Sequence, residues 1–378
     1  MSRRVFALLG RRDEPTDAVE EYCLHLGEAL ASHDFQLELR RVPWEIHGWP
    51  RSLHALRLQA AGWRGVWILV QYTALAWSAR GFPFRFIQAL RILAAAGARI
   101  AVVYHDVEPF AGARLIDRFR RFVQVRTMRR ALDLADVAIF TVPPEKLSWR
   151  PGNQEKTVFI PVGPNLPSQA IASLRHPRLC GNSRRVPSVA VFSITGGEAG
   201  QRETREIIAA VRFASQKLGK LRLSVFGRHA ELREAALRAG LSDSPIELRV
   251  DALLDGVEVV ERLSSCDVLL FVRGPISSRR SSAIAGIACG LPVIAYEGPE
   301  TAPPITQAGV VLVPQSSSGG TSDEARQQGL NDSLLRVLSD AAFCAELSAK
   351  SEMAYQKFFS WHAIADRFSE LFEKNLSP

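Results

Sequence analysis

Arginine and serine residues gather between positions 273 and 282, directly after an apolar run that ends at Val272. The apolar run predicts a buried strand, and the small residues from Ala283 to Cys289 predict a closely packed helix. The free N–H groups and the dipole at a helix start attract anions, and guanidinium groups match phosphate oxygens. The segment Arg273–Gly290 therefore predicts a diphosphate-binding site, although a well-packed helix beside a solvated basic loop gives the same pattern. The candidate ligands are Arg273, Ser277, Arg279, Arg280, Ser281 and Ser282.

A second polar group follows the apolar run Arg99–His105. Ligands of open parallel sheets bind beyond the carboxyl ends of the strands, which is where His105, Asp106 and Glu108 are expected. His105 could donate a hydrogen bond to a substrate hydroxyl, and Asp106 or Glu108 could act as its base. The alternative is structural: a strand-end histidine with its partners satisfied, and Asp106 as a cap.

Three carboxylates, Asp13, Glu14 and Asp17, follow the first apolar run, which ends at Gly10. They are candidates for binding a substrate or for acting as a base. The alternative is that they cap the helix that follows, for which Thr16 is the predicted N-cap.

Apolar runs and helical patterns alternate along the whole chain, so we expect two parallel sheets. The 378 residues are enough for about two domains. The expected fold class is α/β, with two Rossmann-like parallel-sheet domains facing a cleft. Predicted strands are residues 4–9, 35–42, 65–71, 99–105, 137–141 and 156–161, then 188–194, 221–227, 247–250, 267–272, 292–296 and 309–313. Predicted helices begin near residues 17, 84, 114, 203, 230, 257, 281, 331 and 340.

The two series of elements set the expected domain boundaries. Residues 1–166 form the first domain, and residues 167–186, rich in proline and polar residues, form a linker. The second domain spans residues 187–358 and opens with a predicted glycine-rich loop at Gly196–Gly200. The polar run 315–322 is a predicted loop.

The whole chain has a formal net charge of +8, and its positive charge is concentrated in the first half. The segment Arg114–Arg130 combines arginines with Phe119, Phe122, Val125 and Met128, as a basic amphipathic helix does. Such a helix can lie on an anionic membrane, helped by apolar residues expected to be exposed beside it. The alternative is an ordinary helix that buries its apolar face on its own sheet. Nucleic acid is not expected as a partner, because no nucleic-acid-binding module accompanies the charge. The nearby apolar residues are Trp77, Phe82, Phe84 and Phe86.

The five cysteines match neither a zinc site nor a disulfide framework, and no signal peptide or membrane-spanning run is visible. We therefore expect a cytoplasmic protein, or one peripheral on the inner face of the cell membrane. No cofactor is expected. No metal ion is expected either, because no pair of acidic residues stands where a metal would be needed.

The segment Phe271–Ala295, which ends in ACGLPVIA, resembles the signature of glycosyltransferase family 4, the GT-B enzymes called glycosyl transferases group 1. In that family a helix beginning EAMACG precedes LPVV. Four other segments are also similar to family motifs. The segment IPVGPN from Ile160 resembles the IPNG turn, and FSITGG from Phe192 resembles the VGRL phosphate loop. The segment VFGR from Val225 resembles VGDG, and FSWHAIADRF from Phe359 resembles FSWEKIAERL.

The resemblance implies transfer of a sugar from a nucleotide diphosphate-sugar to a hydroxyl acceptor, with retention favoured. The second domain would bind the nucleotide-sugar. The first domain would bind a glycan or lipid-linked acceptor, and residues 359–378 would cross back to it as a helix. His105 would lie near the donor sugar, and Asp13, Glu14 and Asp17 would bind the acceptor. Further donor-binding candidates are Thr195, Gly196, Gly197, Arg202, Arg205 and Arg228.

The chain departs from the family at two glutamates that stand eight positions apart. Their counterparts are Ser277 and Ala285, and alanine cannot bind the hydroxyl groups of a ribose. Glu297, Glu300 or a backbone group is expected to take over. This departure keeps two alternatives open: a nucleotide-sugar epimerase on the same fold, and a non-catalytic binding or scaffold protein.

Overall fold

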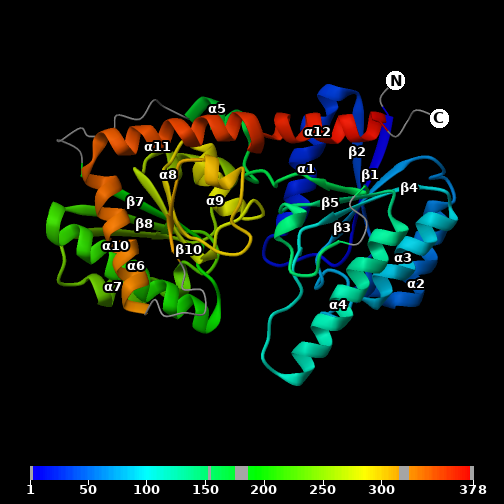
Figure 1. The fold of residues 1–378 in the computed structure, drawn as a ribbon, viewed down its shortest axis with the longest axis horizontal. Coiled ribbons are helices and arrows are strands. Elements are labelled where there is room, and N and C mark those ends of the chain that lie inside the picture. The colour runs from blue at the N-terminus through cyan, green and yellow to red at the C-terminus, as the bar shows by residue number, and fades with distance from the viewer. Residues whose placement is uncertain (1–2, 152–154, 175–185, 315–322, 375–378) are drawn as a thin grey trace. The chain divides into compact units, whose positions relative to one another are not determined.

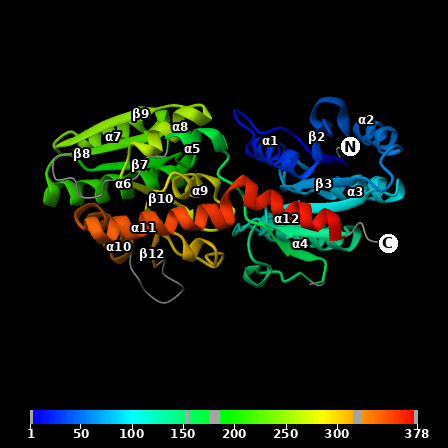
Figure 2. The same cartoon turned by 90° about the horizontal axis from the view of Figure 1, so that it is seen from above.

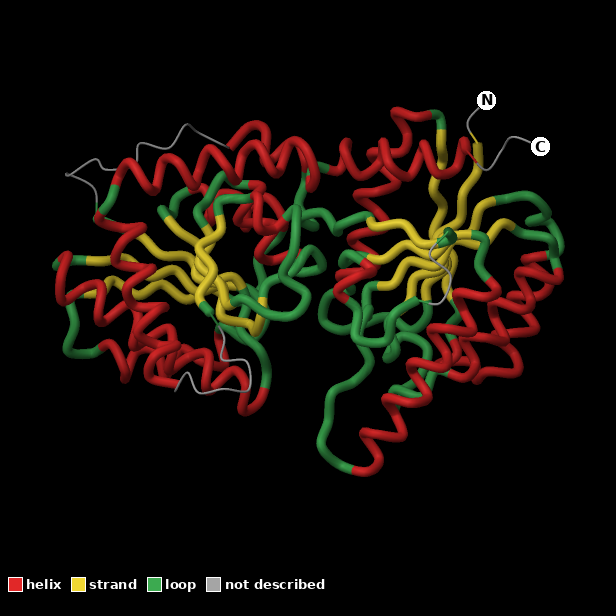
Figure 3. Tube along the Cα trace, in the orientation of Figure 1, coloured by secondary structure: helices red, strands yellow, loops and turns green. Residues whose placement is uncertain are grey.

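The structure is a computed structural model that describes residues 3–151, 155–174, 186–314 and 323–374. The chain divides into two compact units, one of Met1–Val162 with Trp361–Pro378 and one of Gly163–Ser360. Each unit contains one six-stranded sheet with parallel pairing throughout. Figure 3 shows the strands of each unit lying between helices. The predicted α/β class with two Rossmann-like sheets is therefore confirmed.

The sheet of the first unit has the order β2-β1-β3-β4-β5-β6 (Figure 1). Its strands are β1 (Arg3–Leu9), β2 (Phe35–Arg41), β3 (Trp67–Tyr72), β4 (Arg99–Tyr104), β5 (Val137–Phe140) and β6 (Thr157–Phe159). The strands β3, β4 and β5 are apolar and almost wholly buried, as expected of parallel strands covered on both faces. The helices α2 (Trp44–Ala60), α3 (Phe84–Ala95) and α4 (Leu115–Leu134) pack in series and share one apolar core with the sheet.

Helices α1 (Ala18–Leu30) and α12 (Trp361–Lys374) pack against each other, although more than 300 residues separate them in the sequence (Figures 1 and 2). The ring of Trp361 lies 5.3 Å from that of Tyr22, and the ring of Phe372 lies 5.1 Å from that of Phe35. The short 3₁₀ helix η1 (Ala31–His33) follows α1 and also contacts α12. These aromatic contacts make the last helix part of the first unit's core.

The sheet of the second unit has the order β12-β11-β10-β7-β8-β9. Its strands are β7 (Ser188–Phe192), β8 (Leu221–Phe226), β9 (Ile246–Asp251), β10 (Val268–Pro275), β11 (Val293–Tyr296) and β12 (Val310–Val313). One face contacts α6 (Gly197–Leu218) and α10 (Asp323–Ser339), which pack on each other. The other helices are α5 (Ser168–Leu174), α7 (Glu234–Leu241), α8 (Gly256–Ser264), α9 (Ser281–Ala288) and α11 (Ala341–Ala354).

Several elements differ from the sequence-based expectation. Helix α2 was not predicted, because Gly48 and Pro50 look like turn residues; Gly48 has φ 72° and does break the helix locally. The predicted loop Gly196–Gly200 is instead the start of α6. Asp17, not Thr16, caps α1. Helix α5 lies within the predicted linker.

Towards the end of the chain, α10 begins at Asp323, well before the predicted residue 331. The predicted helix 340–359 is α11 followed by the π-helix η5 (Tyr355–Phe359). The predicted loop 315–322 lies outside the described residues. In the described ranges, no helix is both long and apolar enough to cross a membrane.

Candidate functional site

The neighbouring strands β7 and β10 of the second unit are followed by the loops that carry the predicted anion-binding residues. The strand order reverses direction between them, since β8 and β9 lie beyond β7 while β11 and β12 lie beyond β10. Ligands of open α/β sheets bind at such a switch point, beyond the carboxyl ends of the strands. The carboxyl end of β10, which includes Arg273, the residues 276–280 that follow it and the start of α6 after β7 are thus in the position expected of a ligand site.

Arg279 and Ser277 are both engaged by Glu300, which follows β11. The guanidinium of Arg279 donates from Nε to Glu300 Oε2 at 2.7 Å and from Nη2 to Oε1 at 2.9 Å. The Ser277 hydroxyl donates to Oε2 at 3.0 Å. Burial raises the pKa of Glu300, but hydrogen bonds and charge from Arg279 outweigh it and bring the pKa below its usual value. Glu300 is therefore an ionised partner of the loop.

Arg273 and Arg280 are held differently from Arg279, because their buried Nε atoms have no hydrogen-bond partner among the described residues. Burial, together with the charges of Arg279 and Arg273, lowers the pKa of Arg280 to about 10. Burial also lowers the pKa of Arg273, with the nearby Arg228 contributing. Both groups stay charged at neutral pH. Two desolvated cations that lack hydrogen-bond partners at Nε favour an anion between them.

Helices α6 and α9 both begin at this edge of the sheet, and in the described residues no side chain caps either of them. The buried Glu203 accepts a hydrogen bond from the backbone N–H of Thr195 at 2.7 Å, which folds the loop back onto α6. Gly200 permits this close return, because a Cβ there would meet the Thr195 carbonyl oxygen at 1.8 Å. The predicted Gly196 and Gly197 are the N-cap and first residue of α6, and no side chain crowds Gly197.

Sequence reasoning missed Glu203 and Arg233, and the structure places both at this loop. Arg233 donates to the Gly197 carbonyl at 2.7 Å, and the charge of Glu203 acts on Arg273 and Arg280. Glu203 stands at the start of the predicted helix and gave no signal in the sequence, because its role depends on the turn that precedes it.

The other predicted donor ligands are at the same edge with different exposure. Arg228 follows β8, and its carbonyl accepts from Ile194 at 2.9 Å. Ser281 and Ser282 are half-buried in the first turn of α9. Arg202 and Arg205 lie exposed on α6, and Glu297 is exposed directly after β11.

The first unit has a cavity of about 240 Å³ at its own switch point, between the ends of β1 and β3. Its lining includes Gly10 and Arg11 after β1, Gln71 and Thr73 on the β3 side, and Asp106 after β4. Gly10 allows the two loops to meet, because a Cβ there would lie 2.3 Å from the Ala76 carbonyl oxygen. A second cavity, of about 330 Å³, adjoins Asp106 and Glu108.

The predicted His105 does not line the first of these cavities; it contacts Gln71, which does. Gln71 donates its amide N–H to the Leu69 carbonyl, so its oxygen faces His105 Nε2 at 2.8 Å and assigns the imidazole proton to Nε2. Burial lowers the pKa of His105 to about 4, against the opposing charge of Asp17. His105 is thus neutral, and its donor is committed to Gln71, contrary to the expectation that it donates to a substrate hydroxyl.

The five predicted carboxylates of the first unit differ in their contacts. Asp17 is buried and accepts from the N–H groups of Val19 and Glu20 at 3.1 Å as the cap of α1. Glu108 accepts from both the N–H and the hydroxyl of Ser148. Asp106 accepts from the Ala74 N–H at 2.8 Å and lines both cavities. Asp13 lines the first cavity, whereas Glu14 is exposed outside it.

For Arg114–Arg130 the alternatives were a helix that lies on a membrane and a helix that buries its apolar face on its own sheet. Each describes one half of α4. The second half buries Met128 and half-buries Val125, but the first half leaves Phe119 and Phe122 54% and 62% exposed. Leu115 and Ile116 extend this exposed face. Phe84 is exposed nearby, whereas Trp77 and Phe86 are core residues, contrary to expectation, because the ring of Trp77 packs on that of Phe86.

No family model and no curated protein matches this chain. Solved structures match it over nearly their whole length. HepE from Anabaena, crystallised with UDP and glucose, has a TM-score of 0.60 at 14% identity, covering 98% of this chain and 100% of its own. A glycosyltransferase from Rickettsia africae has a TM-score of 0.61 at 11% identity, covering 100% and 99%.

A third similar structure is WaaG, a glycosyltransferase involved in lipopolysaccharide biosynthesis. It has a TM-score of 0.55 at 13% identity, covering 97% of this chain and 99% of its own. At such identities the likeness shows the fold, and that fold is the two-domain Rossmann-like arrangement called GT-B.

Proposed function

We propose that this chain is a glycosyltransferase that moves a sugar from a nucleotide diphosphate-sugar to a hydroxyl acceptor. The observation that carries the proposal is the pair of guanidinium groups of Arg273 and Arg280, whose buried Nε atoms lack hydrogen-bond partners in the described structure. They lie at the switch point of the second sheet, beside two helix starts that no side chain caps. The presence of UDP in the HepE crystals, in the same fold, supports a nucleotide diphosphate as the ligand.

The arginines supply the electrostatic part of the reaction. As the bond between the sugar and the diphosphate breaks, negative charge develops on the leaving phosphate. Arg273 and Arg280, fixed before the reaction, stabilise that charge without reorganisation, and no metal ion is required for this task. Arg279 contributes less, because Glu300 neutralises it.

The acceptor would bind in the cavity of the first unit. Asp106 is the best placed base, because it lines that cavity, while both oxygens of Glu108 accept hydrogen bonds from Ser148. Neutral His105 acts through Gln71, a cavity residue that it holds in place. It is a positioning residue in this scheme.

Binding of nucleoside diphosphates, followed by calorimetry, tests the donor site. We expect UDP or another nucleoside diphosphate to bind the purified chain. Arg280→Ala should weaken that binding about 10- to 100-fold, the usual worth of a charge-assisted hydrogen bond. The matched control is Arg238→Ala, an exposed arginine on α7 that pairs with Glu234. If no nucleoside diphosphate binds, or if the two variants bind equally well, the proposal fails. Binding without turnover of any nucleotide-sugar would favour a non-catalytic role.

The acceptor is proposed to be lipid-linked or a polysaccharide precursor, reached at the cytoplasmic face of a membrane. The supporting feature is the α4 apolar surface, made of Leu115, Ile116, Phe119 and Phe122. Exposed arginines flank this surface: Arg118 lies next to Phe119, and Arg126 lies one turn after Phe122. Apolar side chains rimmed by basic ones suit the boundary of an anionic bilayer. The involvement of WaaG in lipopolysaccharide biosynthesis is in keeping with such an acceptor.

A further inference from the structure

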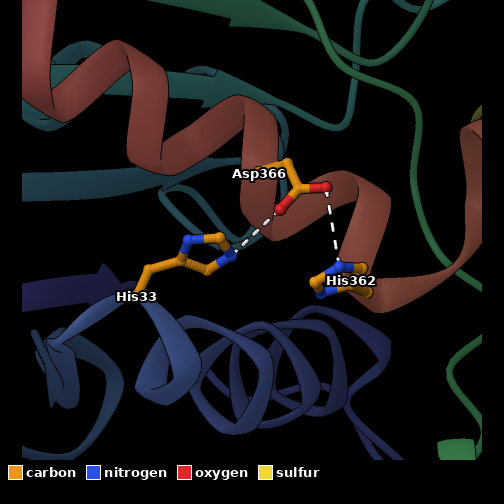
Figure 4. Close-up of side chains that lie close together, drawn as sticks. All are labelled: His33, His362 and Asp366. Carbon is orange, nitrogen blue, oxygen red and sulfur yellow. Dashed lines mark ion pairs between the residues drawn. The ribbon is translucent and has the colours of Figure 1, made fainter.

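Two histidines and an aspartate come together where α12 packs on the end of α1. His33 is the last residue of η1, and His362 and Asp366 stand one turn apart on α12 (Figure 4). The Nε2 atom of His33 lies 3.0 Å from Asp366 Oδ1, and that of His362 lies 3.9 Å from Asp366 Oδ2. One donor atom from each residue can be chosen so that all lie within 4.8 Å of one another.

The contact between His33 and Asp366 is close without being a well-formed hydrogen bond. Although the two atoms are 3.0 Å apart, His33 Nε2 has no hydrogen-bond partner of acceptable geometry among the described residues, and it is buried. The ring nitrogen of His33 and the carboxylate oxygen of Asp366 are close, but no N–H points from one to the other. Two ligands of one metal ion are arranged in this way.

The spacing also suits a shared ion. Two donor atoms that each lie about 2.1 Å from one ion are about 3 to 4.2 Å apart, depending on the angle between them. The 3.0 Å between His33 Nε2 and Asp366 Oδ1 falls in this range, and one donor atom from each of the three residues lies within 4.8 Å of the other two. The His362 side chain is 76% exposed, so its ring can rotate to close the remaining gap.

Two of the three ligands project from the same face of one helix, because residues four apart in a helix are neighbours. The third comes from a separate element that aromatic packing already holds in place. Trp361 packs on Tyr22 and His25, with ring centroids 5.3 and 5.5 Å apart. The site is therefore largely preformed in the folded chain and does not depend on an ion for its assembly.

We propose that His33, His362 and Asp366 bind a divalent transition-metal ion, with Zn²⁺ as the occupant. Imidazole nitrogens with one carboxylate oxygen suit Zn²⁺, and water completes a four-coordinate shell. The ion would fasten the first turn of α12 to η1, directly after Ser360, where the chain passes from one unit into the other. This structural site is distinct from the sugar-transfer chemistry, and the inference does not rest on the proposed function.

Zn²⁺ titrated into the chelator-treated full chain, followed by calorimetry, tests the proposal. We expect one ion to bind with micromolar affinity, and Co²⁺ to give visible d–d bands when it replaces Zn²⁺. His33→Asn and Asp366→Asn should each weaken the affinity about 10-fold or more, since each removes one of three ligands. The matched control is His54→Asn, an exposed histidine of α2, which should bind as the unchanged chain does.

Hydrogen exchange supplies a second measurement that no change in overall folding can imitate. Zn²⁺ should slow the exchange of the amides in α12 in the unchanged chain and in His54→Asn, and should leave it unchanged in His33→Asn. Melting in the presence of chelator checks that the variants remain folded. Absence of binding to the unchanged chain, or binding that His33→Asn and Asp366→Asn leave intact, would overturn the proposal.

Discussion

The carboxylate of Glu300 and the guanidinium of Arg279 form a two-point ion pair, with N–O distances of 2.7 and 2.9 Å. The pair puts a carboxylate beside Ser277, the position where the family motif has a glutamate. The negative charge is thus supplied from another loop. Because Glu300 neutralises the charge of Arg279, the proposed diphosphate site depends on Arg273 and Arg280.

Glu300→Gln should destabilise the chain by about 2 kcal/mol, because it removes the charged acceptor of three hydrogen bonds and the negative charge of the ion pair with Arg279. Denaturant unfolding of the two proteins measures the difference. Glu297→Gln, at the exposed neighbouring position, is the control and should leave the free energy of unfolding unchanged. Equal stabilities of all three proteins would show that the pair contributes nothing to the fold.

Glu297→Ala should weaken binding of UDP about 10-fold and leave binding of pyrophosphate unchanged. The reason is that Glu300 is occupied by Arg279 and Ser277, so the exposed carboxylate of Glu297 is the one available to the ribose hydroxyls. Calorimetry with the two ligands separates the ribose contribution from that of the diphosphate. Arg280→Ala serves as the reverse control, since it should weaken both ligands. A loss of pyrophosphate binding in Glu297→Ala would contradict this assignment.

Phe119→Ser with Phe122→Ser should abolish binding to anionic vesicles, because both side chains belong to the α4 apolar surface and are more than half exposed. Flotation with anionic and with zwitterionic vesicles measures it. Arg118→Glu with Arg126→Glu should have the same effect on anionic vesicles, by repulsion. Leu232→Ser, at a residue of the second unit that is 65% exposed, is the control. Vesicle binding that survives both double variants would exclude α4 as the contact.

The strands were predictable from the sequence because parallel strands buried on both faces form continuous apolar runs. Thus β3, β4 and β10 were expected within a few residues of their bounds. Helix α2 was not, because a local break at Gly48 resembles a loop when only the sequence is known.

The candidate site was predictable where it depends on the ends of strands, and not where it depends on the path of loops. Arg273 and Arg280 were expected, because Arg273 lies near the carboxyl end of an evident strand, β10, and Arg280 follows that strand. The ion pair that distinguishes Arg279 from these two arginines was not expected, because it joins Arg279 to Glu300 in a loop 21 residues away. The hydrogen bond that fixes the proton of His105 likewise comes from Gln71 on a neighbouring strand, 34 residues away.

Gly286→Ala should destabilise the second unit by about 1 to 3 kcal/mol, the usual cost of overpacking a core. Helix α9 lies so close to β10 that a Cβ on Gly286 would meet the Leu269 side chain at 2.5 Å. The small residues expected to permit close packing therefore do so at this position. Gly62→Ala is the control, because a Cβ there would meet nothing within 4 Å. Thermal unfolding should separate the two variants, and similar melting temperatures would show that Leu269 moves aside without cost.

His105 should make the stability of the first unit depend on pH. Its pKa in the folded state is about 4, below the ordinary value of 6.5, because burial penalises the charged imidazolium. Between these values the unfolded chain binds a proton that the folded chain does not. Stability is therefore complete above about pH 6.5 and falls as the pH drops towards 4, by about 3 kcal/mol in all.

His105→Asn should remove this part of the pH dependence, since asparagine does not titrate. Urea unfolding of both proteins at pH 5 and pH 7.5 measures it: the unchanged chain should lose more stability between the two pH values than the variant does. His54→Asn, at an exposed position, should behave as the unchanged chain. The carboxylates titrate alike in all three proteins, so the difference isolates His105. If His105→Asn loses as much stability as the unchanged chain, the folded state does not lower the pKa of His105, and burial with the hydrogen bond to Gln71 does not favour the neutral imidazole.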